Sequence, residues 1–394
     1  MNSVSLYAHI PFCAQKCFYC DFFSVPEKCG IPEEYVDSLL SEASYYADWL
    51  HIDSWRTLYV GGGTPSLLST EQLMRLVRGL GEVRPFALGS EITVEMNPES
   101  VSSDLLGACE ASGVNRISLG IQALDDKPLS AVHRICSAAK CMEVLSLFEK
   151  NWRGRLSVDF IAGLPGQTYS SFKNQFDKIF SYKKIDHISL YTLTIEENTP
   201  LGKLVSDGKI AFSQDKADNM WILGRNILEK NGFFQYEVSN FARPGFESRH
   251  NKTYWHLEDY VGIGAGASGT IYEKSLRWNN LRGIKSYCEF WKNGMAGDIS
   301  SVRETENLSA ETIEFEFLMM GFRLLEGISE QTFFRRFGKN LLELENSDGT
   351  KIGLIFDKWR KNRLLRVQGN SPERTFSLNK RGILFLNRFL EELI

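Results

Sequence analysis

The first half of the chain alternates two kinds of segment, and this alternation limits the possible folds more than any other feature of the sequence. Short runs rich in apolar and β-branched residues predict six strands, at residues 5–11, 56–60, 91–96, 116–121, 156–161 and 187–194. Apolar residues at helical spacing predict amphipathic helices between them, at residues 33–50, 70–80, 103–112, 137–151 and 169–182. Because such helices make right-handed crossovers, we expect an α/β fold with six parallel strands covered on both faces.

Chemically unusual residues stand at or near the carboxyl ends of these strands. The alternation alone fits both an open sheet and a barrel-like sheet. In strand order, the unusual residues are three cysteines, the GGGTP stretch at 61–65, Glu95, Gln122, Asp159 and Tyr191. In a barrel-like sheet the carboxyl ends converge on one mouth, whereas in an open sheet the outer strands could not share a site. We therefore predict a partial six-unit (β/α) barrel in residues 1–212.

The pattern changes after residue 212. A helix at 214–231 leads into a region rich in glycine, aromatic residues and histidine, which we assign to an extension at 213–300. The rest is mostly helical and contains one strand pair: helices at 283–293, 310–325, 330–337, 351–361 and 380–393, strands at 364–367 and 374–378. Helices followed by a hairpin suggest a winged-helix-like C-terminal domain at 301–394. Winged-helix-like domains either bind nucleic acid or pack against the rest of their own protein. Because this chain is acidic overall, we favour the packing role.

Composition and charge exclude several classes of function. The 394 residues carry a formal net charge of −4, from 45 basic and 49 acidic side chains, so we expect no general binding of nucleic acid. The start of the chain lacks a basic segment followed by an apolar run, and no apolar stretch approaches membrane-spanning length. Eight cysteines in a chain of this length do not suggest a disulfide framework. We therefore expect a cytoplasmic protein in which clustered thiols are metal ligands.

Three cysteines, Cys13, Cys17 and Cys20, lie within eight residues, and no fourth follows closely. Iron–sulfur clusters take thiolates at such short loop spacings, and three ligands leave one iron of a [4Fe–4S] cubane open. An open position marks a reactive metal site rather than a structural one. The alternative is zinc, with His9 or Cys29 as fourth ligand, but zinc sites usually pair two cysteine knuckles and the chain has one. The spacing favours the [4Fe–4S] cluster.

The CxxxCxxC spacing, with Tyr19 before the last cysteine, resembles the signature of radical S-adenosylmethionine (SAM) enzymes. In that family SAM binds the open iron through its amine and carboxylate, and the fold is a six-unit partial barrel. Six further stretches resemble the branch that contains oxygen-independent coproporphyrinogen III oxidase and the HemW-like heme chaperones: LYAHIPFC, GGGTPS, VEMNPES, RISLGIQA, VDFIAGLPGQT and YEVSNFARPG. The resemblance extends from residue 6 to about residue 280.

The resemblance implies a SAM site at the barrel mouth. It would comprise Tyr7, Gly62, Gly63, Thr64, Glu95, Gln122, Arg134 and Asp159. The glycines would let backbone groups approach the methionyl amine, the carboxylates and the glutamine would bind the amine or the ribose hydroxyls, and the arginine would pair with the carboxylate. Each residue also has a simpler alternative, such as a carboxylate that caps a turn or a GGGTP stretch that is only a tight bend.

Three sequence features bear on the choice between oxidase and chaperone. The oxidase motif runs CxxxCxxCxC, and this chain has Phe22 where the last cysteine would stand. The oxidase also carries a segment before its first strand, for which we expect no room here. Residues 250–255 match the HNxxYW motif of the chaperone group. One departure is Cys136 in HRICSA, where relatives often have histidine.

The HNxxYW motif makes heme a plausible ligand, because histidine is a common proximal ligand of heme iron. The resemblance implies a heme site made of His250, Asn251, Tyr254 and Trp255, in which the two aromatic residues offer flat faces to the porphyrin. His133, His187 and His256 are alternative ligands, and His250 could instead be an ordinary buried histidine. We predict a heme chaperone that carries a [4Fe–4S] cluster and SAM and delivers heme to an unidentified acceptor protein, with a homodimer as one candidate assembly and the oxidase as the alternative function.

Overall fold

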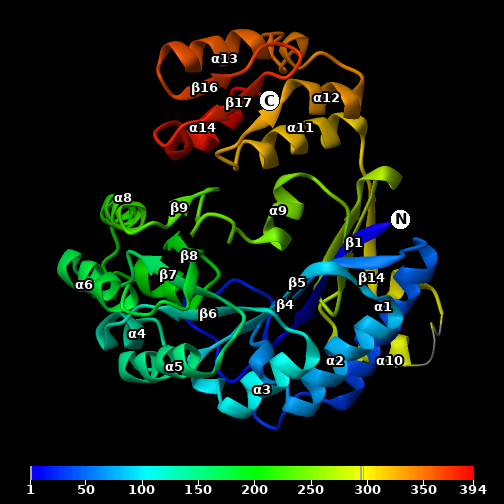
Figure 1. Ribbon diagram of the computed structural model, residues 1–394, viewed down its shortest axis with the longest axis vertical. Coiled ribbons are helices and arrows are strands. Elements are labelled where there is room, and N and C mark those ends of the chain that lie inside the picture. Colours follow the sequence, from blue (N-terminus) through cyan, green and yellow to red (C-terminus); the bar gives the residue numbers. More distant parts are fainter. Residues whose placement is uncertain (1, 293–294, 296) are drawn as a thin grey trace.

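The computed structural model describes residues 2–292, 295 and 297–394, and a mixed sheet runs through most of them (Figure 1). At its centre, six strands lie side by side and all parallel: β1 (Ser3–Ile10), β4 (Ser54–Gly62), β5 (Phe86–Met96), β6 (Arg116–Gln122), β7 (Arg155–Ala162) and β8 (Ile185–Thr192). The predicted α/β fold with six parallel strands is therefore confirmed. The strand order leaves the sheet open at both ends, as a partial barrel requires.

Helices cover the outer face of these strands along the lower side of Figure 1. They are α1 (Glu33–Trp49), α2 (Thr70–Val83), α3 (Ser103–Ser112), α4 (Asp126–Ala131), α5 (Ala138–Asn151) and α6 (Tyr169–Ile179). Local chemistry fixes their starts, because Ser69 and Thr168 each form a capping box with the residue three positions later. Gly113 ends α3 in the left-handed conformation. All of these helices except the short α4 match predicted segments.

The inner face of the six strands is a polar column. Side chains alternate along a strand, so every second residue points inward. In β1 these residues are Ser5, Tyr7 and His9, and in β4 they are Thr57 and Tyr59, which pair in register with their neighbours on β1. The same alternation brings the inward residues of β5 to β8 to this column, in the order Glu91, Glu95, Arg116, Ser118, Ser157, Asp159, His187 and Ser189.

The sheet continues beyond the six strands at both edges. Beside β1 lie the parallel strand β11 (Tyr260–Ile263) and then three antiparallel strands, β12 (Ser268–Ile271), β13 (Leu276–Asn280) and β14 (Arg303–Asn307). Beside β8 lie β10 (Asn240–Ala242) and β9 (Phe234–Gln235). The sequence analysis expected no strands here, because polar stretches such as Arg303–Asn307 lack the apolar runs on which strand prediction depends. One hydrophobic core extends from Val4 to Val302, so the predicted segments 1–212 and 213–300 share it.

Four helices and two short strands complete this part of the chain. The helices are α7 (Pro200–Ser206), α8 (Gln214–Lys230), α9 (Arg249–Trp255) and α10 (Ile284–Lys292). The strands are β2 (Phe12–Cys13) and β3 (Val25–Pro26), which pair with each other around the cysteine segment. Helix α10 begins one residue after its predicted start, and its predicted last residue, Asn293, lies outside the described residues. None of the described helices is long and apolar enough to cross a membrane.

The C-terminal region forms a second core, drawn in orange and red above α8 and α9 in Figure 1. It contains α11 (Ala310–Gly321), α12 (Glu330–Phe337), α13 (Ile352–Lys361), α14 (Leu386–Glu391) and a sheet of β15 (Ile328–Ser329), β17 (Thr375–Leu378) and β16 (Leu365–Gln368). The expected last helix is shorter than predicted, because Gly382 begins a 3-10 turn packed against the carbonyl of Leu364. Leu257, just after α9, inserts into this second core and joins the two regions.

Candidate functional site

A cavity of about 510 Å³ opens at the carboxyl ends of the six strands. It brings together most of the residues predicted for the cluster and for SAM: Cys13, Cys17, Cys20, Gly62, Gly63, Thr64, Glu95, Gln122, Arg134 and Asp159. They come from the carboxyl-terminal parts of four strands, β4 to β7, from the segment after α4 and from the cysteine segment, as expected for a barrel mouth. We call this space the mouth cavity.

The cysteine segment lies along one wall of the mouth cavity. Cys13 is buried and accepts a hydrogen bond from Thr64 Oγ1 at 3.4 Å, and Cys17 Sγ accepts one from Arg134 Nη1 at 3.6 Å. A hydroxyl and a guanidinium thus donate to two of the three sulfurs. In residues 2–292, 295 and 297–394, no three His, Cys, Asp or Glu side chains converge closely enough to hold a metal ion. Three thiols in one short segment are the donor type that iron–sulfur clusters use, and ligation by the three cysteines stays a prediction.

Two half-buried carboxyl groups face the mouth cavity, one from β5 and one from β7. Glu95 accepts hydrogen bonds from Tyr59 Oη at 2.7 Å and from the backbone N–H of Gly62 at 3.0 Å. Burial raises the pKa of Glu95 to about 7 and also raises the pKa of Asp159, which accepts from Ser118 Oγ at 3.1 Å. A bound cation would lower both pKa values again. This part of the mouth cavity therefore suits an ammonium group.

Arg134 lines the mouth cavity between the cysteine segment and β6. Its Nη2 donates to Asn97 Oδ1 at 3.1 Å and also to the carbonyl of Gly120, while its Nε bonds to no described residue. Gln122 ends β6 with a φ of 68°, a left-handed conformation that non-glycine residues rarely adopt and that often marks functional sites. Gly120 has no side chain, which leaves room for both Gln122 and Asn97.

The glycines of the GGGTP stretch are required first by the fold. A Cβ on Gly62 would lie 2.4 Å from His9 Nδ1, and one on Gly63 would lie 2.6 Å from the carbonyl oxygen of Phe12. The N–H groups of Gly63 and Thr64 already donate to the carbonyls of Ile10 and Phe12. Close packing against β1 and the cysteine segment therefore needs glycine here, whether or not a ligand approaches. Any ammonium bound at this stretch would meet carbonyl oxygens rather than N–H groups.

Tyr7 lies on the polar column rather than on the wall of the mouth cavity. Its hydroxyl hydrogen-bonds His9 Nδ1 at 2.9 Å, and its ring stacks on Tyr59 at 6.2 Å. Tyr59 was missed by the sequence analysis, although it bonds directly to Glu95. Strand alternation was the available signal, because Tyr59 points to the same side as Gly61 two residues later. Cys136 does not line the mouth cavity, since it is buried with its sulfur 3.6 Å from that of Cys141.

The HNxxYW motif forms helix α9, which begins after the N-cap residue Ser248. His250 is only 1% exposed, and its ring stacks on Tyr59 at 5.1 Å. Its Nδ1 hydrogen-bonds Thr57 Oγ1 at 2.7 Å, and its Nε2 hydrogen-bonds the Tyr254 hydroxyl at 2.8 Å. Burial lowers the pKa of His250 to about 3, so the imidazole is neutral. Iron could reach Nε2 only by displacing Tyr254.

The other residues of the predicted heme site lie around α9. The indole of Trp255 stacks under Arg323 of the C-terminal region at 4.4 Å, and its Nε1 bonds to no group in the described part of the chain. Asn251 lies in the first turn, where its backbone N–H donates to Ser248 Oγ. Tyr254 packs edge-on against both His250 and Tyr260. These contacts place the motif at the junction between barrel and C-terminal region.

The alternative heme ligands differ in accessibility. His187 is fully buried and bonds to Ser157 Oγ and the Tyr236 hydroxyl. His133 is exposed and stacks on Phe18 at 4.5 Å, and His256 is exposed and bonds to Glu326 at 2.7 Å. If accessibility alone decided which histidine ligates heme iron, His133 or His256 would be favoured over His250.

Comparison with known proteins identifies the relatives of this chain. Residues 7–179 match the Radical SAM superfamily. The chain is 36% identical to "Heme chaperone HemW" of Lactococcus lactis, over 88% of this chain and 89% of the relative, and 33% identical to the protein of that name in Bacillus subtilis, over 86% and 88%. It is also 39% identical to mouse "Radical S-adenosyl methionine domain-containing protein 1, mitochondrial", over 83% of this chain and 74% of that one.

A solved structure shows the same fold. Coproporphyrinogen III oxidase (HemN) from Escherichia coli, a radical SAM enzyme by its description, superimposes with a TM-score of 0.81. The match covers 100% of this chain and 90% of the oxidase, at 20% sequence identity. At that identity the likeness concerns the architecture, and it confirms the predicted radical SAM fold.

Proposed function

Because the chain belongs to the HemW family of the radical SAM superfamily, we propose that it binds heme and transfers it to acceptor proteins. The observation that carries this proposal is its similarity, over most of its length, to relatives named heme chaperones. The oxidase alternative is not favoured. Phe22, where the oxidase motif has a further cysteine, lines the mouth cavity with 72% of its surface exposed.

We propose that Cys13, Cys17 and Cys20 hold a [4Fe–4S] cluster and that SAM occupies the mouth cavity beside it. A cluster of this kind supplies an electron and an open iron site to SAM when both are bound. The protein's part is to bind and orient: Glu95 and Asp159 would accept hydrogen bonds from the amine or ribose hydroxyls. The unpartnered Nε of Arg134 supports a role in binding the SAM carboxylate.

For heme, we propose His250 as the axial ligand, through Nε2. Its burial supports this role in one respect, because ligation requires a neutral imidazole. Ligation also requires that the hydrogen bond to Tyr254 breaks and that α9 moves away from Arg323, which covers Trp255. Heme binding by this motif would therefore loosen the contact between the barrel and the C-terminal region.

The function is tested by anaerobic reconstitution of the cluster, followed by incubation with hemin or with coproporphyrinogen III. We expect near-stoichiometric hemin binding with a shifted Soret band, and no decarboxylation of the porphyrinogen. His250→Ala should change the Soret spectrum, while the exposed His256→Ala serves as the matched control and should not. An unaltered spectrum in His250→Ala would move the ligand to another histidine. Absence of hemin binding by the wild type would refute the chaperone function.

A further inference from the structure

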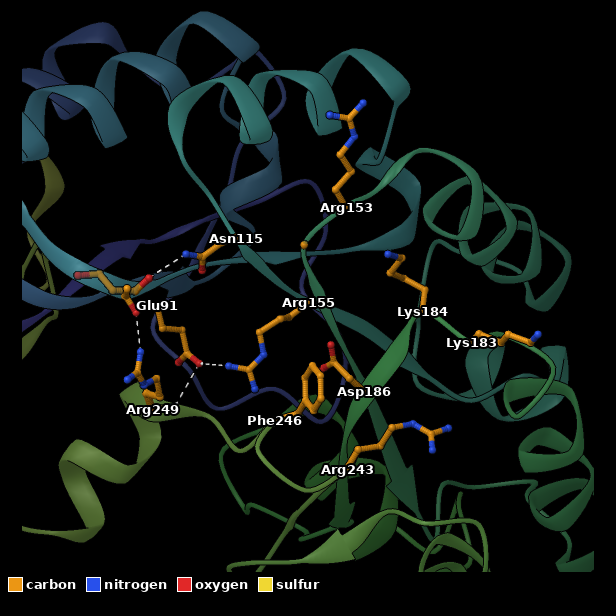
Figure 2. Close-up of a pocket in the computed structure, with 13 residues that line it drawn as sticks. Glu91, Asn115, Arg153, Arg155, Lys183, Lys184, Asp186, Arg243, Phe246 and Arg249 are labelled. Carbon is orange, nitrogen blue, oxygen red and sulfur yellow. Dashed lines mark hydrogen bonds and ion pairs between the residues drawn. The ribbon is translucent and has the colours of Figure 1, made fainter.

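A second cavity, of about 550 Å³, opens at the amino-terminal end of the parallel strands, opposite the mouth cavity (Figure 2). Its walls come from the starts of β5, β7 and β8 and from the segment between β10 and α9. We call it the basal cavity. Its lining residues include Glu91, Arg153, Arg155, Lys183, Lys184, Asp186, Arg243, Phe246 and Arg249.

The basal cavity concentrates positive charge in a chain whose net charge is −4. Six of its lining residues are arginine or lysine and only two are acidic. Three of the six carry charge that no neighbour neutralises: the side chains of Lys183, Lys184 and Arg153 form no hydrogen bond or ion pair with any described residue. Uncompensated cations around a concave surface raise the local concentration of anions and bind them.

The two acidic residues do not cancel this charge. Glu91 is 2% exposed and already accepts from Arg155 Nη1 at 3.1 Å and from three groups at the start of α9. Asp186 is 7% exposed, and its Oδ1 bonds to no group in the described part of the chain. Arg155 Nε is likewise buried without a partner. Buried polar atoms are nearly always hydrogen-bonded, and of these two atoms Arg155 Nε is a donor that suits an anion, whereas Asp186 Oδ1 is an acceptor and offers nothing to one.

An aromatic ring lies among these charges. Phe246 keeps 38% of its surface exposed, and the guanidinium of Arg155 lies 5.1 Å from its ring centroid. In Figure 2 the ring stands between Arg155 and Arg243, with Asp186 beside it. A site that offers both an apolar face and several cations suits a ligand that is flat and apolar with carboxylates along one edge. An inorganic anion would leave the ring unused.

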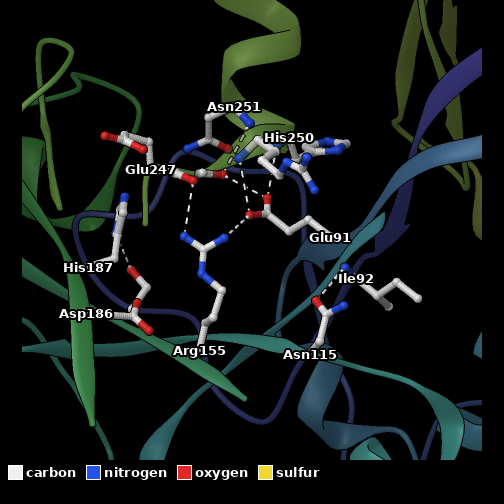
Figure 3. Close-up of polar contacts among 12 residues, drawn as sticks. Glu91, Ile92, Asn115, Arg155, Asp186, His187, Glu247, His250 and Asn251 are labelled. Carbon is white, nitrogen blue, oxygen red and sulfur yellow. Dashed lines mark hydrogen bonds and ion pairs between the residues drawn. The ribbon is translucent and has the colours of Figure 1, made fainter. Parts of the chain in front are cut away.

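The basal cavity is joined to the HNxxYW segment through Glu91 (Figure 3). One oxygen of this carboxylate binds Arg155 and the backbone N–H of Arg249, and the other binds the backbone N–H of His250 at 3.0 Å. The wall of the cavity and the start of α9 are thus held by the same side chain. A ligand that draws Arg155 away from Glu91 would also disturb the start of α9.

We infer that the basal cavity binds the propionate carboxylates of heme, with Phe246 against the edge of the macrocycle. This inference rests on the proposed heme-binding function and adds a location for the charged edge of the ligand. Arginine binds carboxylates through paired N–H groups, and lysine contributes point charge. The volume lies in the range of small-ligand cavities. Lys183 and Lys184 supply the attraction at the rim.

The test compares hemin with its dimethyl ester, in which both carboxylates are blocked. The charge variant is Lys183→Gln/Lys184→Gln, and the matched control is Lys173→Gln/Lys178→Gln on exposed positions of α6, which removes the same charge elsewhere. We expect about tenfold weaker hemin binding in the first variant and wild-type binding in the second, as loss of two charge-assisted contacts implies. Binding of the ester should be equal in all three proteins. Phe246→Ala should weaken the binding of both compounds.

Inorganic pyrophosphate is added as a competitor to identify an anion site of another kind. If hemin occupies the basal cavity through its carboxylates, pyrophosphate should displace hemin from the wild type and leave ester binding unchanged. Tight pyrophosphate binding together with hemin binding that ignores the lysine substitutions would assign the cavity to phosphates and overturn the inference. Equal affinity of the wild type for hemin and ester would also overturn it. Failure of the wild type to bind hemin at all would instead remove the proposed function.

Discussion

Replacement of Glu91 by glutamine should destabilise the start of α9 far more than the loss of one surface charge would. The carboxylate side chain is 1% exposed and pairs with Arg155, which is 22% exposed. It also accepts the backbone N–H groups of Arg249 and His250 and the hydroxyl of Ser248. Glutamine keeps the size of the side chain but removes the charge and turns an N–H₂ group toward these donors. The effect is therefore electrostatic rather than steric.

The magnitude follows from what Glu91→Gln leaves unpaired. Removal of one partner of a buried ion pair costs about 3–5 kcal/mol. Since Arg155 keeps some contact with water, we take the lower end, about 3 kcal/mol, which corresponds to roughly a 100-fold change in an equilibrium constant. The assay is amide hydrogen exchange of peptides that cover residues 247–256. We expect roughly 100-fold faster exchange there and wild-type exchange in α2, which lies on the outer face of the barrel.

The control for this experiment is Glu304→Gln, which removes the same charge from an exposed position on β14. It should leave exchange in residues 247–256 unchanged. An increase of less than threefold in Glu91→Gln would refute the reasoning, because it would mean that the four contacts of this carboxylate contribute no more than those of a surface residue.

Three further predictions concern the cluster, SAM and heme. Cys17→Ala should abolish binding of about four irons per reconstituted chain, while the exposed Cys29→Ala should retain it; colourless wild type with stoichiometric zinc would contradict this. Since ammonium binding needs the ionised form of Glu95, whose pKa is about 7, SAM affinity should rise with pH through 7, and Glu95→Gln should lose that dependence. Because burial holds the pKa of His250 at about 3, hemin ligation should not vary between pH 5 and 8; a midpoint near 6.5 would reveal a solvated imidazole.

The barrel could be predicted because each of its strands carries its own signal. In β6, for example, RISLGIQ is buried along almost its whole length and alternates apolar residues with the inward-pointing Arg116 and Ser118, a pattern typical of a strand. The strands β13 and β14 could not be predicted in this way. LRWNN in β13 has only two apolar residues and RETEN in β14 has none, and they are strands because each pairs with the strand beside it. Strand propensity depends on such context far more than helix propensity does.

The mouth cavity could be predicted because its residues lie at successive strand ends, where the barrel geometry brings them together. The surroundings of His250 could not. Thr57, which hydrogen-bonds His250 Nδ1, lies 193 residues away in the chain, and no local sequence pattern predicts that contact. The role of Glu91 also escaped the sequence analysis. Strand alternation puts Glu91 and Glu95 on the same side of β5, but the partner that explains Glu91, Arg155, is 64 residues distant.

The position of Tyr59 has a consequence for how the two proposed ligands influence each other. Its hydroxyl binds Glu95 at the mouth cavity, and its ring stacks on His250, so one side chain contacts both proposed binding sites. If SAM changes how Tyr59 is held, it changes the affinity for heme, and thermodynamic linkage then requires heme to change the affinity for SAM by the same factor. Tyr59→Phe keeps the ring and removes the hydroxyl. This substitution would remove the hydrogen bond to Glu95 and leave the stacking on His250 in place. The affinity for each ligand would then no longer depend on whether the other is bound.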